Sequence, residues 1–313
     1  MKKSQLALLM TSIISILLLM GCDKQNSTEP ALTDEDAITA LIAEDALFKS
    51  DDMLLNDGDP SVGPSFSLAK SETAILPRAW GRKIESFQRS VNFSTLTDST
   101  AEATITHTMS GFIWIRAKYS QQDTSLTTIK KNFTEITTRV AKFIRVNRHK
   151  DASKNWRISE ISAVKGGTVG SQITINEIRF YVGSDTIVVT DPNSTFLQFS
   201  KGRGRCIPEL SVNLNTPCRV QVTVTSTSAD SDFVTVHRPF MMNNRWNYRS
   251  PMVLLSSTSN GDGTFTRTYE HNWNGVLGGR HNVLVSALTR STLFDDDPTK
   301  ISSQIWGIPF IVF

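Results

Sequence analysis

Residues 101–115 read AEATITHTMSGFIWI, and this stretch decides how the first half of the chain is expected to fold. Every second residue from Ala101 to His107 is Ala, Ile or His, the residues between them are Glu and Thr, and Phe112–Ile115 is fully apolar. A period of two is typical of a β-strand that buries one face, and Thr and Ile favour strands over helices. Similar patterns on either side predict further strands near residues 87–93, 133–146 and 156–164.

One helix is expected before these strands, over Thr33–Asp57. Thr33 or Asp34 can cap its N-terminus, and Asp36 lies in the first turn, where an acidic side chain is favoured. Apolar residues recur at helical spacing along the segment: Ile38, Leu41, Ile42 and Ala46. The run Asp-Gly-Asp-Pro at 57–60 ends the helix.

The last strand of this unit contains NWRISEI at residues 155–161. A helix followed by about four long antiparallel strands with a Trp in the final strand resembles the nuclear transport factor 2-like superfamily over residues 34–165. The resemblance implies an α+β domain, in which a curved sheet wraps around helices and often encloses an apolar pocket. A cystatin-like α+β domain and an irregular β-rich domain are the competing interpretations. KGGTVGS at 165–171 is read as a linker.

Residues 172–313 are expected to form an all-β sandwich, because short strands recur at regular spacing. Val220, Val222 and Val224 alternate cleanly, and NGDG at 260–263 predicts a hairpin turn. From about Pro217 the pattern resembles immunoglobulin-like domains of bacterial surface proteins. The spacing of the two cysteines in this part does not support the antibody type.

The N-terminus carries a different signal. Lys2 and Lys3 precede a 15-residue, mostly apolar run from Leu6 to Met20, which is too short to span a bilayer and has the size of a signal-peptide core. The run ends in LMGC at 19–22, which resembles a bacterial lipobox. The resemblance implies cleavage after a signal peptide at 1–21 and acylation of Cys22, so that two or three acyl (palmitate-like) chains hold the protein on a membrane. An ordinary signal peptide or an anchor helix with a chance cysteine is the alternative.

A lipid-anchored body is expected outside the cytoplasm, in the bacterial cell envelope or periplasm, with the inner or outer membrane left undecided. Residues 22–33 are polar and are read as a flexible tether. Cys206 and Cys218 are the remaining cysteines, and an oxidising compartment favours a disulfide between them. Two free thiols, or half of a metal site, are the other possibilities.

Charge and motif content exclude some functions. The 33 Lys and Arg residues against 30 Asp and Glu residues leave a net charge of +3, too weak a bias for a nucleic-acid binder. No hydrolase or metalloprotease motif occurs, so neither a catalytic residue, a cofactor nor a metal is predicted. Asp295–Asp297 is the densest acidic run, but it lacks the spacing of a calcium loop and is read as a solvated turn.

The leading hypothesis is therefore a non-enzymatic binding or scaffolding lipoprotein with an envelope protein as partner. The candidate contact residues combine aromatic rings with guanidinium groups: Arg245, Trp246, Tyr248 and Arg249. The alternatives place a small apolar ligand, or an isomerase or dehydratase reaction, in a pocket within residues 34–165. His107 is the candidate acid or base for such an enzyme.

Overall fold

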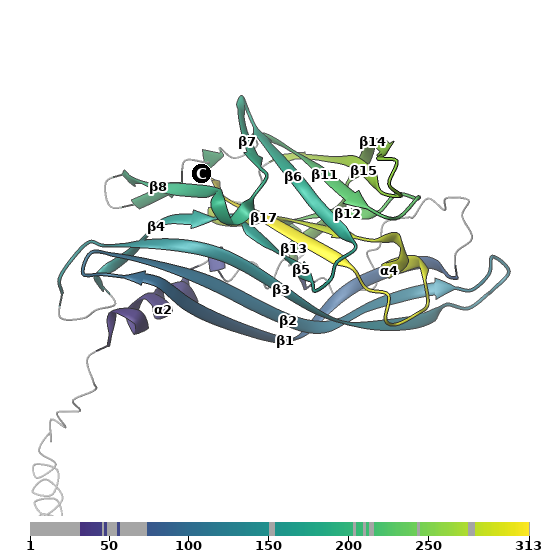
Figure 1. The fold of residues 1–313 in the computed structure, drawn as a ribbon, viewed down its shortest axis with the longest axis horizontal. Coiled ribbons are helices and arrows are strands. Elements are labelled where there is room, and N and C mark those ends of the chain that lie inside the picture. Colours follow the sequence, from purple (N-terminus) through teal and green to yellow (C-terminus); the bar gives the residue numbers. More distant parts are fainter. Residues whose placement is uncertain are drawn as a thin grey trace, which may run out of the picture.

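The computed structural model describes residues 32–45, 47–48, 55–56, 74–149, 154–202, 205–208, 211–212, 216–242, 245–274 and 279–312. These residues form two β-sheets with short helices between and beside them (Figure 1). The predicted lipid-attachment site at Cys22 and most of the predicted tether lie outside the described residues.

The larger sheet, as described, has 12 strands, and its central path runs β13-β12-β16-β17-β5-β3-β4-β8-β9. On the side of β3 opposite β4 and β5, β2 pairs with β3 and β1 with β2, while β10 pairs with β17. Its strands are β1 (Leu76–Leu96), β2 (Thr100–Lys118), β3 (Thr127–Arg145), β4 (Trp156–Ser162), β5 (Val164–Thr168), β8 (Phe196–Gly202), β9 (Arg205–Pro208), β10 (Ser211–Val212), β12 (Phe233–Met242), β13 (Arg245–Pro251), β16 (Gly279–Leu288) and β17 (Ser303–Val312).

The smaller sheet has five described strands in the order β14-β15-β11-β6-β7. They are β6 (Ile173–Val182), β7 (Asp185–Val189), β11 (Pro217–Ser226), β14 (Val253–Ser259) and β15 (Phe265–Asn274). The described helices are α2 (Asp34–Glu44), α4 (Arg290–Phe294) and the 3-10 turn η2 (Pro192–Ser194).

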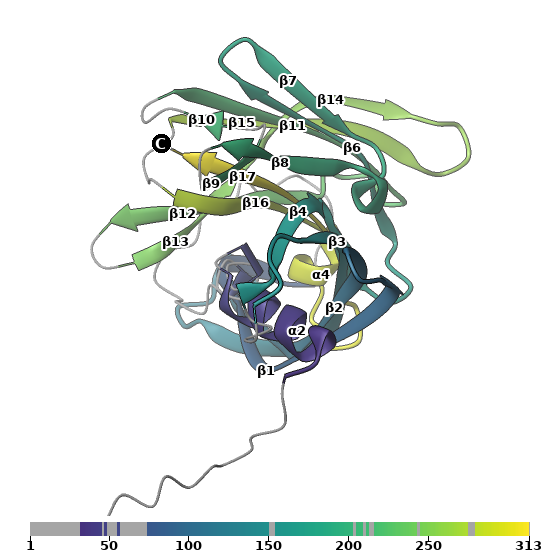
Figure 2. The same ribbon diagram turned by 90° about the vertical axis from the view of Figure 1, so that its left-hand side faces the viewer.

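Three layers result, as Figure 2 shows. The small sheet packs on one face of β12, β16 and β17, and the other face of these strands looks toward the long, curved strands β1–β3, with α2 and α4 between them. We call the concave side of β1–β3 the cradle. Arg249 on β13 donates to the backbone oxygen of Trp80 on β1 at 2.8 Å, so strands from separate parts of the large sheet meet on that side.

Strict alternation explains the sandwich core. Val283, Val285 and Ala287 of β16 point to the small sheet, and Asn282, Leu284 and Ser286 point to the cradle. The sandwich core is almost entirely aliphatic and aromatic, and includes Val220, Val222 and Val224 of β11. As predicted, residues 172–313 are mostly strand in the part that the structure describes, but the large sheet that the small sheet packs on also contains β1–β5.

The predicted α+β class of the first domain is wrong, because the described chain is dominated by strands. The helix begins where it was predicted, with a capping box between Thr33 and Asp36, but it ends at Glu44, since Asp45 takes an extended conformation. The strands are also longer than predicted: β1 already begins at Leu76. The sheet therefore curls around a short helix rather than resting on several.

The stretch read as a linker at 165–171 contains all but the first residue of β5, which lies between β3 and β17. A Cβ on Gly166 would lie 2.2 Å from the Ile136 backbone oxygen, and one on Gly167, whose φ is +144°, would lie 2.2 Å from the Ser303 oxygen. These glycines allow close approach of neighbouring strands. The large sheet is thus continuous at the predicted boundary between 34–165 and 172–313; the division into two domains stays a prediction.

Candidate binding surface

Charged side chains are buried inside the cradle. The carboxylate of Glu135 on β3 pairs with Arg82 on β1 at 3.0 Å, and both side chains are at most 1% exposed. Ser303 donates to the same carboxylate oxygen at 2.5 Å, and Arg82 also donates to Ser286 at 3.3 Å. This cluster links β1, β3, β16 and β17. It therefore joins the layer formed by β12, β16 and β17, which we call the middle layer, to the cradle.

His107, the candidate acid or base, also lies inside the cradle and is 2% exposed. Arg89 Nε donates to His107 Nε2 at 3.0 Å, and the Phe87 ring meets the imidazole edge-on. Burial, with the positive charges of Arg89 and Arg139 adding to it, lowers the pKa of His107 to about 3. The imidazole is therefore neutral near pH 7 and its acceptor nitrogen is occupied by Arg89.

The N-terminal segment occupies the cradle. Arg139 and Asn282 donate to the Leu47 backbone oxygen, and Arg89 donates to that of Phe48. Apolar residues of the same segment are fully buried there: Ile38, Ile42, Leu47, Phe48 and Leu55. The interior in which a ligand pocket was expected is lined and filled by the chain itself at these positions.

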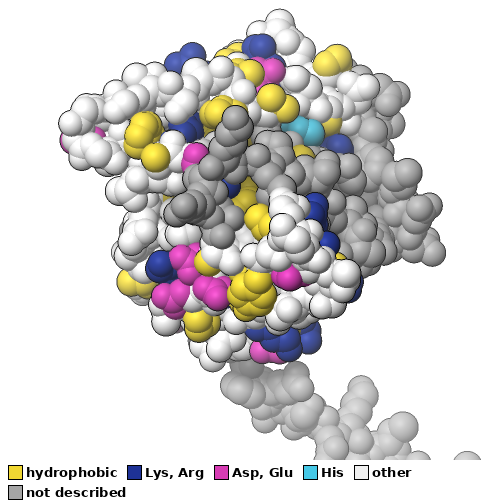
Figure 3. Space-filling model, turned by 90° about the vertical axis from the view of Figure 1, so that its right-hand side faces the viewer, with side chains coloured by type: hydrophobic (Ala, Val, Ile, Leu, Met, Phe, Trp, Pro, Cys, Tyr) yellow, Lys and Arg dark blue, Asp and Glu magenta, His cyan; other side chains and the backbone are white. Residues whose placement is uncertain are grey.

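The acidic run Asp295–Asp297 forms a hydrogen-bonded turn. The Asp297 amide donates to Asp295, Thr299 donates to Asp297, and Lys300 pairs with Asp295 at 2.7 Å. On the face that carries α4, acidic side chains gather beside basic ones and the hydrophobic atoms are scattered (Figure 3). Within the part of the chain that the structure describes, no group of His, Cys, Asp and Glu is arranged to hold a metal ion.

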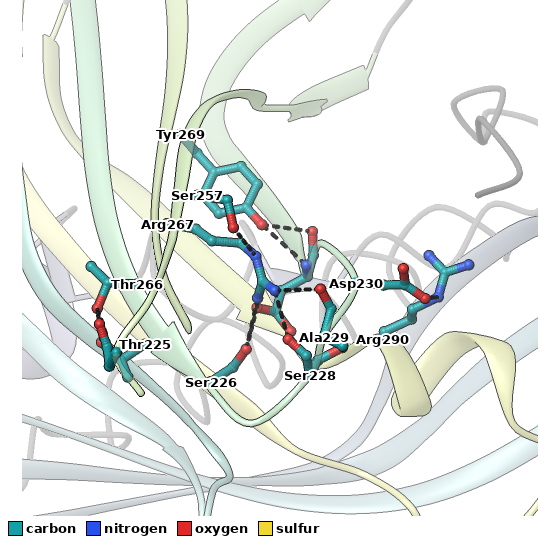
Figure 4. A network of polar contacts seen from close by, with 12 residues as sticks. Thr225, Ser226, Ser228, Ala229, Asp230, Ser257, Thr266, Arg267, Tyr269 and Arg290 are labelled. Atoms are coloured by element: carbon teal, nitrogen blue, oxygen red, sulfur yellow. Dashed lines mark hydrogen bonds and ion pairs between the residues drawn. The ribbon is translucent and has the colours of Figure 1, made fainter. Parts of the chain in front are cut away.

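A second buried ion pair lies at one end of the sandwich (Figure 4). Arg267 on β15 donates to Asp232 at 2.9 Å, to Ser226 and Ser257 at 3.1 Å each, and to the backbone oxygens of residues 228 and 229 at 2.6 and 2.9 Å. Every N–H of the guanidinium has a partner. The network fixes the connection between β11 and β12, which crosses from one sheet to the other.

The two cysteines of the body lie in different sheets. Cys218 on β11 carries a free, buried thiol that contacts the Thr216 backbone oxygen at 3.5 Å, and burial raises its pKa to about 11. Cys206 belongs to β9, and its side chain lies outside the described residues. The predicted Cys206–Cys218 disulfide is therefore not formed in the structure. The two strands also belong to different sheets: β9 pairs with β8 in the large sheet, and β11 is central in the small one.

The predicted partner-binding residues lie on β13. The side chains of Arg245, Trp246 and Tyr248 are outside the described residues, so their role stays a prediction. Arg249 makes contacts within the fold. Its guanidinium lies 3.8 Å from the centre of the Trp80 ring and donates a hydrogen bond to the Trp80 backbone oxygen.

The clearest exposed apolar surface is β14, which the sequence had identified only as one strand of a hairpin. All seven of its residues are exposed, and Val253, Leu254 and Leu255 are 66%, 40% and 53% exposed. β14 pairs with β15 on one side and, among the described strands, has no neighbour on the other. Its sequence, VLLSSTS, contains no charged residue.

Such an edge is unusual, because natural proteins protect exposed edge strands with charges, prolines or covering segments. In the part of the chain that the structure describes, β14 has only a register shift between Leu254 and Ser256. The opposite edge, β7, is five residues long, begins with Asp185 and exposes Val188. β14 is therefore the longer and less protected edge of the small sheet.

Comparisons with protein-family models, with curated proteins and with solved structures find no match to this chain. Among the described residues, no helix combines the length and the apolar content needed to cross a membrane.

Proposed function

We propose that this chain is a lipid-anchored, non-enzymatic protein of the bacterial cell envelope, and that its body binds an extended segment of a partner protein along β14. The lipobox-like LMGC at 19–22 supports the anchor. The exposed edge of β14 supports the binding role and is the single observation that carries it.

An edge strand offers a row of backbone N–H and C=O groups to a second polypeptide, which gains affinity from main-chain hydrogen bonds and specificity from side-chain contacts. Seven residues of strand span about 23 Å. Since β14 carries three apolar residues followed by Ser and Thr, the matching segment is uncharged and rich in β-branched or apolar residues. Burial of Val253 and Leu255 on binding supplies a hydrophobic contribution.

The test uses the full-length protein in intact cells, with a photo-crosslinking amino acid at Leu255 or, as matched control, at Val188 on the opposite edge. We expect an adduct with another envelope protein from position 255 and none from 188. With the crosslinker at Val253, Leu255→Arg should reduce the adduct at least tenfold, and Val188→Arg should leave it unchanged. Equal adducts from both edges, no adduct, or an adduct only with a second copy of this chain would overturn the proposal.

Anchoring is tested separately with Cys22→Ser. We expect this variant to leave the membrane fraction and to lose the electrophoretic shift that acylation produces. A variant that stays membrane-bound with unchanged mobility would contradict the lipid anchor, whatever the result at β14.

A further inference from the structure

A second exposed feature lies at the far end of β6, β11 and β15, away from the hairpin turn between β14 and β15. A cleft of about 620 Å³ opens there, and its lining includes Tyr181, Arg219, Asn272, Trp273 and Asn274. Tyr181, Arg219 and Asn272 are register partners, so they form one row across three neighbouring strands.

The row is held in place by a side-chain network. Tyr181 Oη donates to Gln221 at 3.0 Å, and Gln221 and Asn272 donate to the two oxygens of Glu270 at 2.7 and 3.2 Å. The Arg219 guanidinium lies 3.9 Å from the centre of the Tyr181 ring and 3.8 Å from Glu270, and its side chain is 45% exposed. These polar groups are positioned before any ligand arrives, which lowers the cost of binding.

The chemistry of the cleft favours a neutral, hydroxyl-rich ligand. Within the row, Arg219 and Glu270 balance each other's charge, while Arg238 lies 5.7 Å from the centre of the Trp273 ring. Amide groups of Asn272 and Asn274 can both donate and accept, as sugar hydroxyls require, and aromatic rings such as Tyr181 pack against the apolar face of a sugar.

Hydrolysis is not indicated by the same geometry. A glycosidase needs a pair of carboxylates across the scissile bond, and the described lining of the cleft contains none. Cys218, which also lines the cleft, is 2% exposed, and its raised pKa keeps the thiol protonated. The cleft therefore has the groups for binding without those for cleavage.

We propose that this cleft binds a short, neutral glycan strand, with Arg219, Asn272 and Asn274 contacting hydroxyl or amide groups and Tyr181 contacting a sugar ring. We choose a glycan as the ligand because glycans are abundant in the bacterial cell envelope, so this part of the proposal rests on the localisation given under the proposed function. Binding at the cleft does not depend on β14.

The probe is chitotetraose, a neutral chain of four β-1,4-linked N-acetylglucosamine units, titrated calorimetrically into the full-length protein in detergent. We expect saturable one-to-one binding, and a loss of affinity of at least tenfold in Arg219→Ala and in Asn272→Ala. Thr225→Ala is the matched control: it lies on the same outward face of β11, and its hydroxyl bonds only to Asn176 and Thr266 among the described residues. We expect it to bind like the wild type.

Thermal unfolding of each variant shows whether it is folded, and Asn272→Gln, which keeps the amide, should retain more affinity than Asn272→Ala. No binding by the wild type, or equal losses in Arg219→Ala and Thr225→Ala, would overturn the proposal. The Leu255→Arg variant should bind chitotetraose like the wild type. A loss of partner binding at β14 can therefore be distinguished from a loss of glycan binding at the cleft.

Discussion

The strands β12, β16 and β17 face the small sheet on one side and the cradle on the other, and these two interiors are very different. Toward the small sheet the side chains are apolar, as in Val283 and Val285. Toward the cradle they include Asn282 and Ser286, which bond to arginines from β1 and β3. The same layer is thus stabilised by burial of apolar surface on one face and by hydrogen bonds on the other. Substitutions on the two faces should therefore change the free energy of unfolding in different ways.

The largest effect is expected where the cradle and the middle layer join. Gly166→Val would place a Cβ against the Ile136 backbone and force β5 away from β3. We expect destabilisation by more than about 4 kcal/mol, or loss of the folded state, measured by urea unfolding. Gly170→Ala is the control, because nothing lies within 4 Å of its Cβ position and only the positive φ of 72° is unfavourable there, at about 1 kcal/mol. Similar stability of both variants would contradict the close packing of β5.

In the sandwich, Phe180→Ala removes a ring that stacks on Trp273 at 5.7 Å and meets Phe310 edge-on. We expect a loss of about 3–5 kcal/mol in the free energy of unfolding, from lost burial and the remaining cavity. A second substitution that shortens an apolar side chain next to residue 180 should not restore the free energy of unfolding. A loss below about 1 kcal/mol would show that this interior is loosely packed.

In the cradle, Glu135→Leu leaves the Arg82 guanidinium buried without its carboxylate and should cost about 3–5 kcal/mol, as much as Phe180→Ala. The double variant Arg82→Met/Glu135→Leu removes both charges and should recover most of that loss. Chemical denaturation of the wild type, Arg82→Met, Glu135→Leu and the double variant gives the coupling energy directly. Additive losses in the double variant would mean that the pair does not act as a unit.

Near neutral pH, the smallest effect is a pH dependence that arises from a buried histidine of the cradle. The unfolded chain protonates His107 near pH 6.5, whereas burial lowers its pKa in the folded protein to about 3. The free energy of unfolding should therefore fall as the pH drops from about 6.5 toward 3, by at most about 1.4 kcal/mol per pH unit from this group. His107→Gln should flatten that slope, whereas Phe180→Ala, which removes no titratable group, should keep it. An unchanged slope in His107→Gln would contradict the assignment.

The same contrast explains how far the sequence could predict the structure. The sandwich strands were recognisable, because Val220, Val222 and Val224 show their buried face directly, and the turn at 260–263 follows from Gly261 and Gly263, which have positive φ. The cradle strands show polar residues at inward positions, such as Glu135 and Arg139 on β3. Their partners, Ser303 and Asn282, lie more than 140 residues away, so no local pattern reveals them.

Other features depend on arrangements that are not local. Gly166 and Gly167 were read as a linker, because glycine pairs usually mark turns, whereas here they allow three strands to approach closely. Residues 253–255 were expected as part of a strand, but its place at the edge of the sheet is a property of the topology. The row of Tyr181, Arg219 and Asn272 comes from three separate strands.

The position of β17 has a consequence for the order in which the protein can fold. Gly167 on β5 pairs with Gln304 on β17, 137 residues later, and β17 separates β5 from β16. A chain that is synthesised from its N-terminus exposes the open edge of β5 until residues 303–312 have been made. Such long-range pairing slows folding and leaves strand edges available for aggregation. Pairing of β17 with β5 and β16 therefore closes the large sheet at this point, and until it forms the edge of β5 is open to neighbouring chains.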